Sequence, residues 1–501
     1  MSTIESIMST PPLTVTSDEL VSEAVQRMYG HRVGAVVVVD GHAPVGILTE
    51  RDVLRLTADR PHLGDLTVRE AMTAPVDTVD GSVATEQALT AMHDGGYRHL
   101  AVTGHGELVG VVSLRDLAWA SQAGPVVAPR GLKGVVVADT EIGDVRGTEG
   151  FYHYRQYSAI DLAEQRPIED VWRLMIDGAL PGSPAERRAF VDEVRPLRHI
   201  PDDVREVLPT IARCSSPLEG LRTALSLAAA SHGMRPVLDL DPAGRRHDAL
   251  VLSALAPTLL TALHRLRAGD EPVEPRADLA YAANYLWMLT GTEPSAEHAR
   301  AVEHYLISTV DHGFNASTFT ARVVASTGAD TGACLTAAIG ALSGPLHGGA
   351  PSRALELLHE IGTPERTEEV VRAKVRDGER IMGFGHAVYR TDDPRSLMLR
   401  RIATVLGGPL VELALDVEQR VVAVLEDIKP GRGLKADVEF YAGVVMAACG
   451  IPPTMFTPTF ASSRVIGWCA NMLEQAADNR IIRPSARYVG PPPPQPVAPL
   501  G

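Results

Sequence analysis

The sequence contains few cysteines, few aromatic residues and no long apolar run, and each shortage argues against a class of protein. Only four cysteines occur in 501 residues and no two form a CxxC pair, so we expect neither a disulfide framework nor a zinc site, and a reducing, cytoplasmic location. No run of 18 apolar residues occurs, so no membrane span is expected. The N-terminus lacks a basic segment followed by an apolar one, so no secretory signal is expected.

Positive charge is also scarce. The formal net charge is -15, which argues against a broad nucleic-acid surface but leaves room for a local basic pocket that binds anions. Hydrophobic residues make up 45% of the chain, as in a globular protein, and its length predicts more than one domain. Residues 489–501 are rich in proline and are expected to form a disordered tail.

The first 120 residues contain a duplication. The segment GILTERDV at 46–53 recurs as GVVSLRDL at 110–117, an offset of 64 residues. Each copy has the pattern of an amphipathic helix, a short apolar strand, a turn, a second strand and another helix. In the first copy we expect Ser17 to cap the first helix, and residues 35–39 and 46–49 to be the strands.

This duplication resembles a tandem cystathionine-β-synthase-type (CBS) domain pair over residues 1–121, divided into about 1–64 and 65–121. In that family the strand–helix junction G-h-h-[TS]-x-x-D binds adenine nucleotides, because hydroxyl and N–H groups suit phosphate and aspartate suits ribose. The resemblance implies an adenine nucleotide effector bound by Thr49, Asp52, Ser113 and Asp116.

A second interpretation of these junctions stays open. A junction between a strand and a helix needs an N-cap whether or not a ligand binds. Thr49 and Ser113 are therefore equally suited to act only as caps, in a module that mediates only subunit contacts.

A linker and a helical region follow. Residues 122–130 contain two prolines and a glycine without helical periodicity, and are expected to be a linker. From residue 131 to 488 helical periods dominate, with one apolar face ending near Gly178 and another near Gly291.

Polar residues cluster among glycines in four segments of this region. They are DHGFNASTF at 311–319, GPLHGGA at 344–350, GFGHAVYR at 383–390 continuing to DPR at 393–395, and DVEFYAG at 437–443. One such segment alone is weak evidence for an active site, since structural hydrogen-bond networks use the same residue types. The occurrence of all four in this order is much more specific.

Together these segments resemble the citrate synthase family over residues 131–488. GLKGV at 131–135 and YRQY at 154–157 are similar to the family's GLxGV and YRGY, with Gln156 in place of glycine. The resemblance implies a multidomain fold, with mainly all-α large and small citrate synthase-type domains preceded by the α/β CBS module. It also implies an acyl-CoA:oxaloacetate transferase that forms a carbon–carbon bond and uses acyl-CoA as substrate, with no cofactor and no metal.

The resemblance also implies the roles of individual residues. Glu439 stands at the position of the general base, His347 donates to the developing enol oxygen and His386 hydrogen-bonds the ketone of oxaloacetate. The carboxylates of oxaloacetate are held by His312, Arg395, Arg464 and, from the second subunit of a homodimer, Arg483.

One departure concerns the base. The family's Asn-Val-Asp is here Asp437-Val438-Glu439, and the interval from Glu439 to Arg464 matches that from the family's aspartate to its arginine. Glutamate has a similar intrinsic pKa. It is longer by one methylene, however, and a misplacement of about 1 Å can cost roughly 100-fold in rate. Asp437 as the base would need a shifted segment.

The donor and the activity itself have alternatives. Acetyl-CoA would give citrate and propionyl-CoA would give 2-methylcitrate, and one methylene discriminates by only ~1–3 kcal/mol. A catalytically impaired, nucleotide-binding regulatory protein is the alternative of another class, and the retained histidines and arginines argue against it.

Overall fold

The structure is a computed structural model, and it describes residues 3–31, 33–59, 64–104, 106–121, 129–132, 134–345, 347, 350–385, 389, 391–478, 480–486, 488–491 and 493–495. Two compact units are present. One comprises residues 1–135 together with 484–501, and the other comprises residues 136–483. Separate hydrophobic clusters form the cores of the two units.

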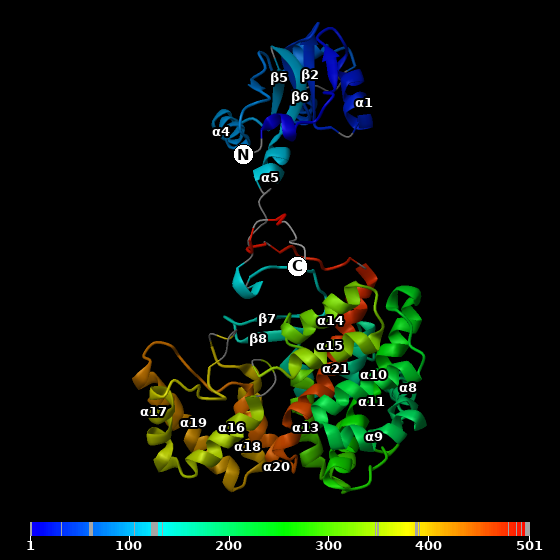
Figure 1. Ribbon diagram of the computed structural model, residues 1–501, viewed down its shortest axis with the longest axis vertical. Helices are drawn as coiled ribbons and strands as arrows, with labels where there is room; N and C mark the ends of the chain where they lie inside the picture. Colours follow the sequence, from blue (N-terminus) through cyan, green and yellow to red (C-terminus); the bar gives the residue numbers. More distant parts are fainter. Residues whose placement is uncertain are drawn as a thin grey trace, which may run out of the picture. The chain divides into compact units, whose positions relative to one another are not determined.

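The N-terminal unit has two repeats with the same order of elements (Figure 1). After the short 3-10 helix η1 (Ile4–Ser6), the first repeat contains β1 (Thr14–Thr16), α1 (Val21–His31), β2 (Ala35–Asp40), β3 (Ala43–Thr49) and α2 (Glu50–Asp59). The second contains α3 (Val68–Ala71), β4 (Thr78–Asp80), α4 (Thr85–Gly95), β5 (His99–Gly104), β6 (Glu107–Ser113) and α5 (Leu114–Ser121). In each repeat the middle strand pairs parallel with the first and antiparallel with the third. The two expected strands of the first repeat are confirmed, as is the helix that follows the second of them.

The two repeats exchange the segments that precede them. Ser9, ahead of the first repeat, forms a β-bridge with Val111 of the second, and Thr73 forms the equivalent bridge with Ile47 of the first. Each member of one pair lies 64 residues from its counterpart in the other. The exchange joins both repeats into one unit.

The same exchange explains the glycine at the start of each repeated motif. A Cβ on Gly110 would lie 2.6 Å from the sulfur of Met8, and one on Gly46 would lie 2.4 Å from the sulfur of Met72. Both distances are shorter than real Cβ contacts, so a side chain at either position would displace the crossing methionine.

The expected cap of the first helix is wrong. Helix α1 begins at Val21, and Ser17 has a different partner. Its hydroxyl accepts a hydrogen bond from Arg69 Nη2 (2.5 Å) and its carbonyl accepts one from the Arg69 N–H (2.8 Å). Leu20 forms a β-bridge with Thr67. Pairing with the segment ahead of the second repeat replaces the first helical turn.

The second unit is largely helical after a small hairpin. Its strands are β7 (Gly143–Arg146), β8 (Phe151–Tyr154) and β9 (Tyr157–Ser158). Its helices are α6 (Ala159–Gln165), α7 (Ile168–Asp177), α8 (Pro184–Val194), α9 (Asp202–Cys214), α10 (Pro217–Ser231), α11 (Pro242–Ala268), α12 (Tyr281–Thr290), α13 (Ala296–Thr309), α14 (Ala316–Ser326), α15 (Thr331–Leu342), α16 (Ala350–Ile361), α17 (Thr367–Arg376), α18 (Pro394–Leu406), α19 (Pro409–Ile428), α20 (Val438–Ala448) and α21 (Phe456–Asp478). Gly178 and Gly291 end α7 and α12 in the left-handed conformation, as expected.

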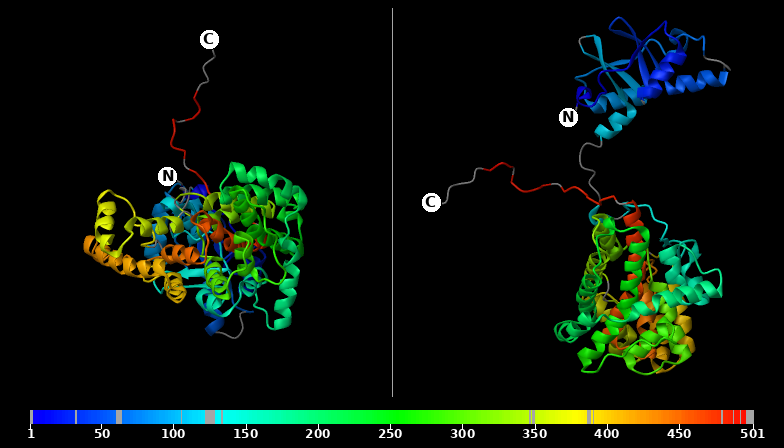
Figure 2. Two further views of the ribbon diagram at one scale, coloured as in Figure 1. Left: turned by 90° about the horizontal axis from the view of Figure 1, so that it is seen from below. Right: turned by 90° about the vertical axis from the view of Figure 1, so that its right-hand side faces the viewer.

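The helices of this unit form two lobes. Figure 1 shows α16 to α20, in yellow and orange, on one side, and α8 to α11 with α14, α15 and α21 on the other; the left view of Figure 2 shows the same separation. Helix α13 packs against α18 and α20 of the smaller lobe and against α12 and α21 of the larger one. Helix α13 therefore lies where the lobes meet.

Helix α11 forms the centre of the larger lobe. All residues from Ala249 to Leu263 are buried. Among the helices in the described part of the chain, α11 alone has the length and composition that could cross a membrane, and 83% of its apolar window is buried inside the unit. That burial is typical of a core helix.

Candidate active site

The motif segments lie at the ends of helices from both lobes. Residues 311–315 join α13 to α14, residues 343–349 follow α15, and residues 383–393 precede α18. The 383–385 segment pairs with 435–437. Gly385 N–H donates to the Lys435 carbonyl (2.8 Å) and Asp437 N–H donates to the Gly383 carbonyl (2.9 Å).

This pairing needs glycine at position 383. Its φ is +84°, and a Cβ there would lie 3.0 Å from the Cβ of Phe440 and 3.1 Å from that of Ala354. The close approach brings the 383–385 segment against the first turn of α20, which carries Glu439. His386, the next residue of the motif, lies outside the described residues.

Arg395 is held at the start of α18 by a buried ion pair. Its Nε and Nη2 donate to the two carboxylate oxygens of Asp393 at 3.0 and 2.8 Å, and the side chains are only 4% and 1% exposed. Asp393 also accepts the N–H of Val438 (3.2 Å). One carboxylate therefore links the candidate substrate arginine to the helix of the candidate base.

Arg464 projects from the middle of α21 and is also buried. Its Nε donates to the carbonyl of Thr309 (2.7 Å), and its guanidinium lies 4.3 Å from the ring centre of Phe460. Burial lowers the pKa of Arg464, while the charge of Asp311 opposes that shift. Arginine remains charged even so, and it provides a second buried cation in the site.

His312 lies among aromatic side chains at the end of α13. Its Nε2 is 2.9 Å from the hydroxyl of Tyr389, and its ring centre is 5.3 Å from that of Tyr152. The guanidinium of Arg395 is 5.8 Å from the ring centres of both tyrosines. Both tyrosine rings therefore contact the two groups predicted to bind carboxylates.

Glu439 and Asp437 differ in how their carboxylates are engaged. Asp437 is the N-cap of α20 and accepts the Glu439 N–H at 2.9 Å. Within the described residues, the Glu439 carboxylate accepts no hydrogen bond. Burial, followed by the charge of Asp437, raises the pKa of Glu439 to about 8. Burial and Asp393 raise that of Asp437 to about 7.

His347 is held through Ser317. Its Nε2 is 2.8 Å from Ser317 Oγ, which also accepts from Trp468 Nε1 (3.2 Å) and lies 2.8 Å from Asn315 Oδ1. Burial, followed by the charge of Arg464, lowers the pKa of His347 to about 4. The imidazole is therefore neutral near pH 7 and has one N–H to donate.

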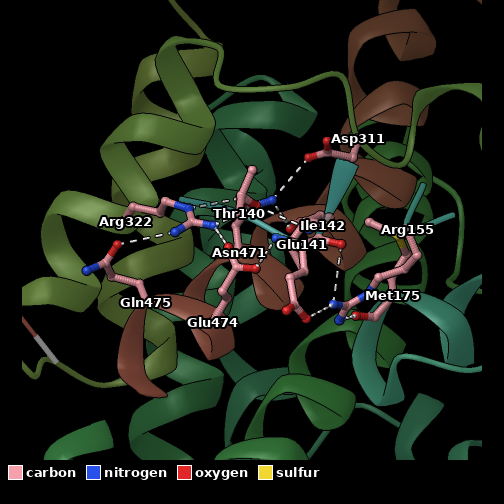
Figure 3. Close-up of polar contacts among 11 residues, drawn as sticks. Thr140, Glu141, Ile142, Arg155, Met175, Asp311, Arg322, Asn471, Glu474 and Gln475 are labelled. Carbon is pink, nitrogen blue, oxygen red and sulfur yellow. Dashed lines mark hydrogen bonds and ion pairs between the residues drawn. The ribbon is translucent and has the colours of Figure 1, made fainter. Parts of the chain in front are cut away.

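A buried polar network supports the loop that carries His312 (Figure 3). Asn471 Nδ2 donates to Asp311 Oδ1 (3.1 Å), and Asn471 Oδ1 accepts from Arg322 Nε (2.9 Å). Arg322 is paired with Glu474, which also accepts the N–H of Glu141 (2.7 Å). The network joins α14, α21 and the segment before β7 to Asp311, the residue directly before His312.

Arg483 is not brought to these residues by this chain. It lies in the segment after α21, its side chain is exposed, and no hydrogen bond or ion pair joins it to the other described site residues. Its predicted role in a second subunit therefore stays a prediction.

The four nucleotide candidates lie in the N-terminal unit and cap its helices reciprocally. Asp52 Oδ2 accepts from the Thr49 N–H (3.1 Å) and hydroxyl (2.6 Å), and Thr49 Oγ1 accepts the Asp52 N–H (3.3 Å). Asp116 and Ser113 form the same three bonds. The geometry is that of two capping boxes, and it leaves nucleotide binding untested.

A pocket lies beside each of these junctions. One, of about 800 Å³, is lined by Val25, Met28, Tyr29, Gly30, Val33, Glu50, Val53 and Leu54. The other, of about 640 Å³, is lined by Arg51, Leu89, Thr90, Met92, His93, Gly96, Tyr97, Arg98 and Leu114. Val25, Met28 and Glu50 recur 64 residues later as Leu89, Met92 and Leu114, so the pockets are equivalent.

Sequence reasoning missed several residues of the site. It assigned no role to Ser317, Tyr389 or Asp393, although all three lie inside the four motif segments. Their position within the motifs was the available signal, but their partners lie 30, 77 and two residues away in sequence. In the described ranges no group of three or more His, Cys, Asp or Glu residues is arranged to hold a metal ion.

Comparison with known proteins gives two family matches. Residues 131–485 match the pattern described as "Citrate synthase, C-terminal domain", and residues 4–59 and 68–123 each match that of the CBS domain. The citrate synthase of Deinococcus radiodurans is 36% identical over 365 residues, covering 72% of this chain and 95% of that protein. That of Haloferax volcanii is 39% identical over 366 residues, covering 72% and 95%.

Solved structures give the same match. The citrate synthase of Pyrobaculum aerophilum has a TM-score of 0.66 at 35% identity, covering 74% of this chain and 94% of that one. The citrate synthase of Thermoplasma acidophilum, in a ternary complex with carboxymethyl coenzyme A and oxaloacetate, has a TM-score of 0.68 at 29% identity, covering 74% and 98%.

Proposed function

Since this chain belongs to the citrate synthase family and is an enzyme of the citrate synthase type, we propose a specific reaction for it. It condenses acetyl-CoA with oxaloacetate and water to give citrate and CoA. The observation that carries this proposal is the Glu439 carboxylate, which accepts no hydrogen bond from the described residues and whose pKa is raised by burial to about 8. It shares one site with neutral His347 and two buried guanidiniums. The similar proteins named as citrate synthases support acetyl-CoA as donor.

Oxaloacetate is a dianion, and the site offers it Arg395, Arg464 and His312. Asp393 balances the charge of Arg395 through a bidentate pair of hydrogen bonds. Arg464 donates to the Thr309 carbonyl and lies over the Phe460 ring. Bringing the substrate carboxylates to two buried cations also lowers the cost of burying those cations.

Formation of the nucleophile requires a base and a hydrogen-bond donor. Ionised Glu439 removes a proton from the methyl group of acetyl-CoA, while His347 donates an N–H to the thioester oxygen as negative charge develops there. Because the pKa of the His347 imidazolium is low, the imidazole stays neutral. A neutral imidazole donates a hydrogen bond to the enol oxygen and keeps its proton. A proton on His347 Nδ1 serves this role, and the Ser317 hydroxyl then donates its single proton to Nε2 instead of to Asn315 Oδ1.

Carbon–carbon bond formation then converts the ketone of oxaloacetate into a hydroxyl, and His386 is proposed to donate to that oxygen. Water cleaves the thioester of the condensed product and releases CoA. The balance is one acetyl-CoA, one oxaloacetate and one water consumed for each citrate and CoA.

Asp437 is the poorer candidate for the base. Its carboxylate is occupied as the cap of α20, and moving it would free the Glu439 N–H. Glu439 carries no such structural bond within the described residues. The neighbouring charge of Asp437 instead contributes to the raised pKa of Glu439, which brings the base closer to neutral pH.

We also propose that an adenine nucleotide binds the N-terminal unit and changes activity. Two equivalent pockets beside the capped junctions support this proposal. Calorimetry of the full chain with AMP, ADP and ATP tests it, and the absence of heat with all three nucleotides would end it.

We propose further that the enzyme is a homodimer in which Arg483 serves the partner's site. The exposure of Arg483, without an ion pair in the described chain, supports this proposal.

The catalytic proposal is tested by thiol release with oxaloacetate and either acetyl-CoA or propionyl-CoA, with the product identified by mass spectrometry. We expect turnover to favour acetyl-CoA, with citrate as product and one CoA released per oxaloacetate. A preference for propionyl-CoA would assign the enzyme to 2-methylcitrate instead, and no turnover with either donor would contradict the catalytic proposal.

A further inference from the structure

Tyr389 contacts two of the groups that are proposed to hold oxaloacetate. It lies in the segment between α17 and α18 of the smaller lobe and is 4% exposed. Its hydroxyl is 2.9 Å from His312 Nε2, on the loop after α13. Its ring centre is 5.6 Å from that of His312 and 5.8 Å from the guanidinium carbon of Arg395.

The chemistry of the phenol suits it to position His312. Burial raises the pKa of Tyr389 well above its usual range, so the hydroxyl keeps its proton. A neutral imidazole has one nitrogen that accepts and one that donates. A proton donated by Tyr389 to Nε2 fixes the plane of the imidazole and places its own proton on Nδ1, and a fixed tautomer is what a hydrogen-bonding histidine requires.

The ring of Tyr389 has a separate effect on Arg395. The guanidinium is bonded at one edge by Asp393 and lies over the rings of Tyr152 and Tyr389. An aromatic face limits rotation of the guanidinium and stabilises its charge. Both contacts of Tyr389 are made within the chain itself, and such preorganisation lowers the ordering cost of binding.

We propose that Tyr389 is a positioning residue that orients His312 and Arg395 to receive oxaloacetate. The inference rests on the proposed function, since that assigns both groups to oxaloacetate. It adds Tyr389 to the residues needed for oxaloacetate binding, although Tyr389 is neither a charged ligand of the substrate nor a general acid or base. Tyr389 touches the groups that bind and is not itself proposed to touch the reacting atoms.

Tyr152 provides a matched control from the same aromatic cluster. Its ring is equally close to Arg395 and also faces His312. Its hydroxyl, however, donates to the carbonyl of Ser308 at 3.0 Å and not to His312. Replacing either tyrosine by phenylalanine removes one buried hydroxyl and keeps the ring, but only Tyr389→Phe removes a bond to His312.

The test compares the full-length enzyme with Tyr389→Phe and Tyr152→Phe, by steady-state kinetics with each substrate varied and by calorimetric binding of oxaloacetate alone. For Tyr389→Phe we expect the KM and Kd for oxaloacetate to rise about five- to tenfold, as for one lost hydrogen bond. The KM for acetyl-CoA should stay within about twofold and kcat within about threefold. Tyr152→Phe should leave the KM for oxaloacetate within about twofold.

Three outcomes would overturn the inference. The affinity for oxaloacetate could be unchanged or tighter in Tyr389→Phe, it could fall equally in Tyr152→Phe, or both substrates could weaken together, as from a general loss of structure. Calorimetry separates this inference from the catalytic proposal. A wild type that binds oxaloacetate more tightly than Tyr389→Phe does, but turns over neither donor, would sustain the inference and contradict the catalysis.

Discussion

Asp393 binds Arg395 through both carboxylate oxygens, at 3.0 and 2.8 Å, although the two residues are separated by only Pro394. Both side chains are almost fully buried. A buried pair of this kind contributes little net stability by itself, but removal of one partner leaves an uncompensated charge. The pair therefore holds a substrate cation in the site while also fixing the start of α18 and the N–H of Val438.

Replacing Asp393 by asparagine should destabilise the 136–483 unit by about 3–5 kcal/mol, because the Arg395 charge stays buried. Scanning calorimetry, which can resolve the transitions of the two units, measures the change. Asp392→Asn is the neighbouring control: its ion pair with Lys435 is 47% exposed on both sides, so its loss should cost no more than about 1 kcal/mol. Equal effects of the two substitutions would refute the role assigned to the buried pair.

The pH dependence of catalysis should follow Glu439. Since the base must be ionised and its pKa is raised to about 8, kcat should increase with pH and level off above that value. In Asp437→Asn the neighbouring negative charge is removed, so the rise should move to lower pH. Stopped assays in a constant-ionic-strength buffer series measure both profiles. A rise at the same pH in both enzymes would count against the pairing of these carboxylates.

Stability should depend on pH through the same group. The pKa of Glu439 is higher in the folded state, so folding retains a proton that the unfolded chain loses above about pH 4.5. Its contribution to stability therefore falls as pH rises from about 4.5 to about 8, and levels off above that pH. Glu439→Gln should gain in thermal midpoint relative to wild type between pH 6 and pH 9, by a few degrees. A constant difference in midpoint across that range would contradict the raised pKa.

Ser317 should act on the rate and not on oxaloacetate binding. Ser317→Ala removes the partner of His347 Nε2, so we expect kcat to fall about 10- to 100-fold while the KM for oxaloacetate changes by less than about threefold. Thr320→Ala is a control on the same helix, since that hydroxyl is exposed and, among the described residues, bonds only to the carbonyl of Ala316. A raised KM for oxaloacetate with an unchanged kcat would contradict the role of His347 as donor to the enol oxygen.

The network behind His312 should be needed for stability. Asn471→Leu leaves Arg322 Nε and Asp311 Oδ1 without their shared partner, and should cost about 2–4 kcal/mol. Met472→Leu, one residue along α21, conserves volume and should cost less than about 1.5 kcal/mol. Calorimetry of both variants checks the difference, and similar midpoints would show that the network has little energetic weight.

Local patterns in the sequence were enough to predict the repeats, two of the three strands in each repeat and the ends of two helices, but not the hairpin strands β7 to β9. The 64-residue offset predicted two equal α/β copies, and glycines at 178 and 291 marked helix ends. Exchange of the leading segments could not be predicted, because it pairs Ser9 with Val111 across the two copies. Pairing of Ser17 with Arg69 and of Leu20 with Thr67 made the expected cap at Ser17 wrong, since long-range partners replaced a local turn.

The site shows the same division. Motif order identified His312, His347, Arg395, Glu439 and Arg464 as candidates, and their chemistry followed from residue type. Sequence alone left Asp437 and Glu439 open as the base, because the choice depends on which carboxylate caps α20. The contact of Tyr389 with His312 spans 77 residues and two lobes, and no local spacing specifies such a contact.

The central claim is that Glu439 is the base of an acetyl-CoA:oxaloacetate condensation. Thiol release at pH 8 by wild type, Glu439→Gln and Asp437→Asn tests it most directly, with calorimetric midpoints to verify folding. The account predicts that Glu439→Gln retains less than about 1% of the wild-type rate and that Asp437→Asn, whose asparagine still caps α20, stays within about tenfold. Activity lost in Asp437→Asn but kept in Glu439→Gln would contradict the account.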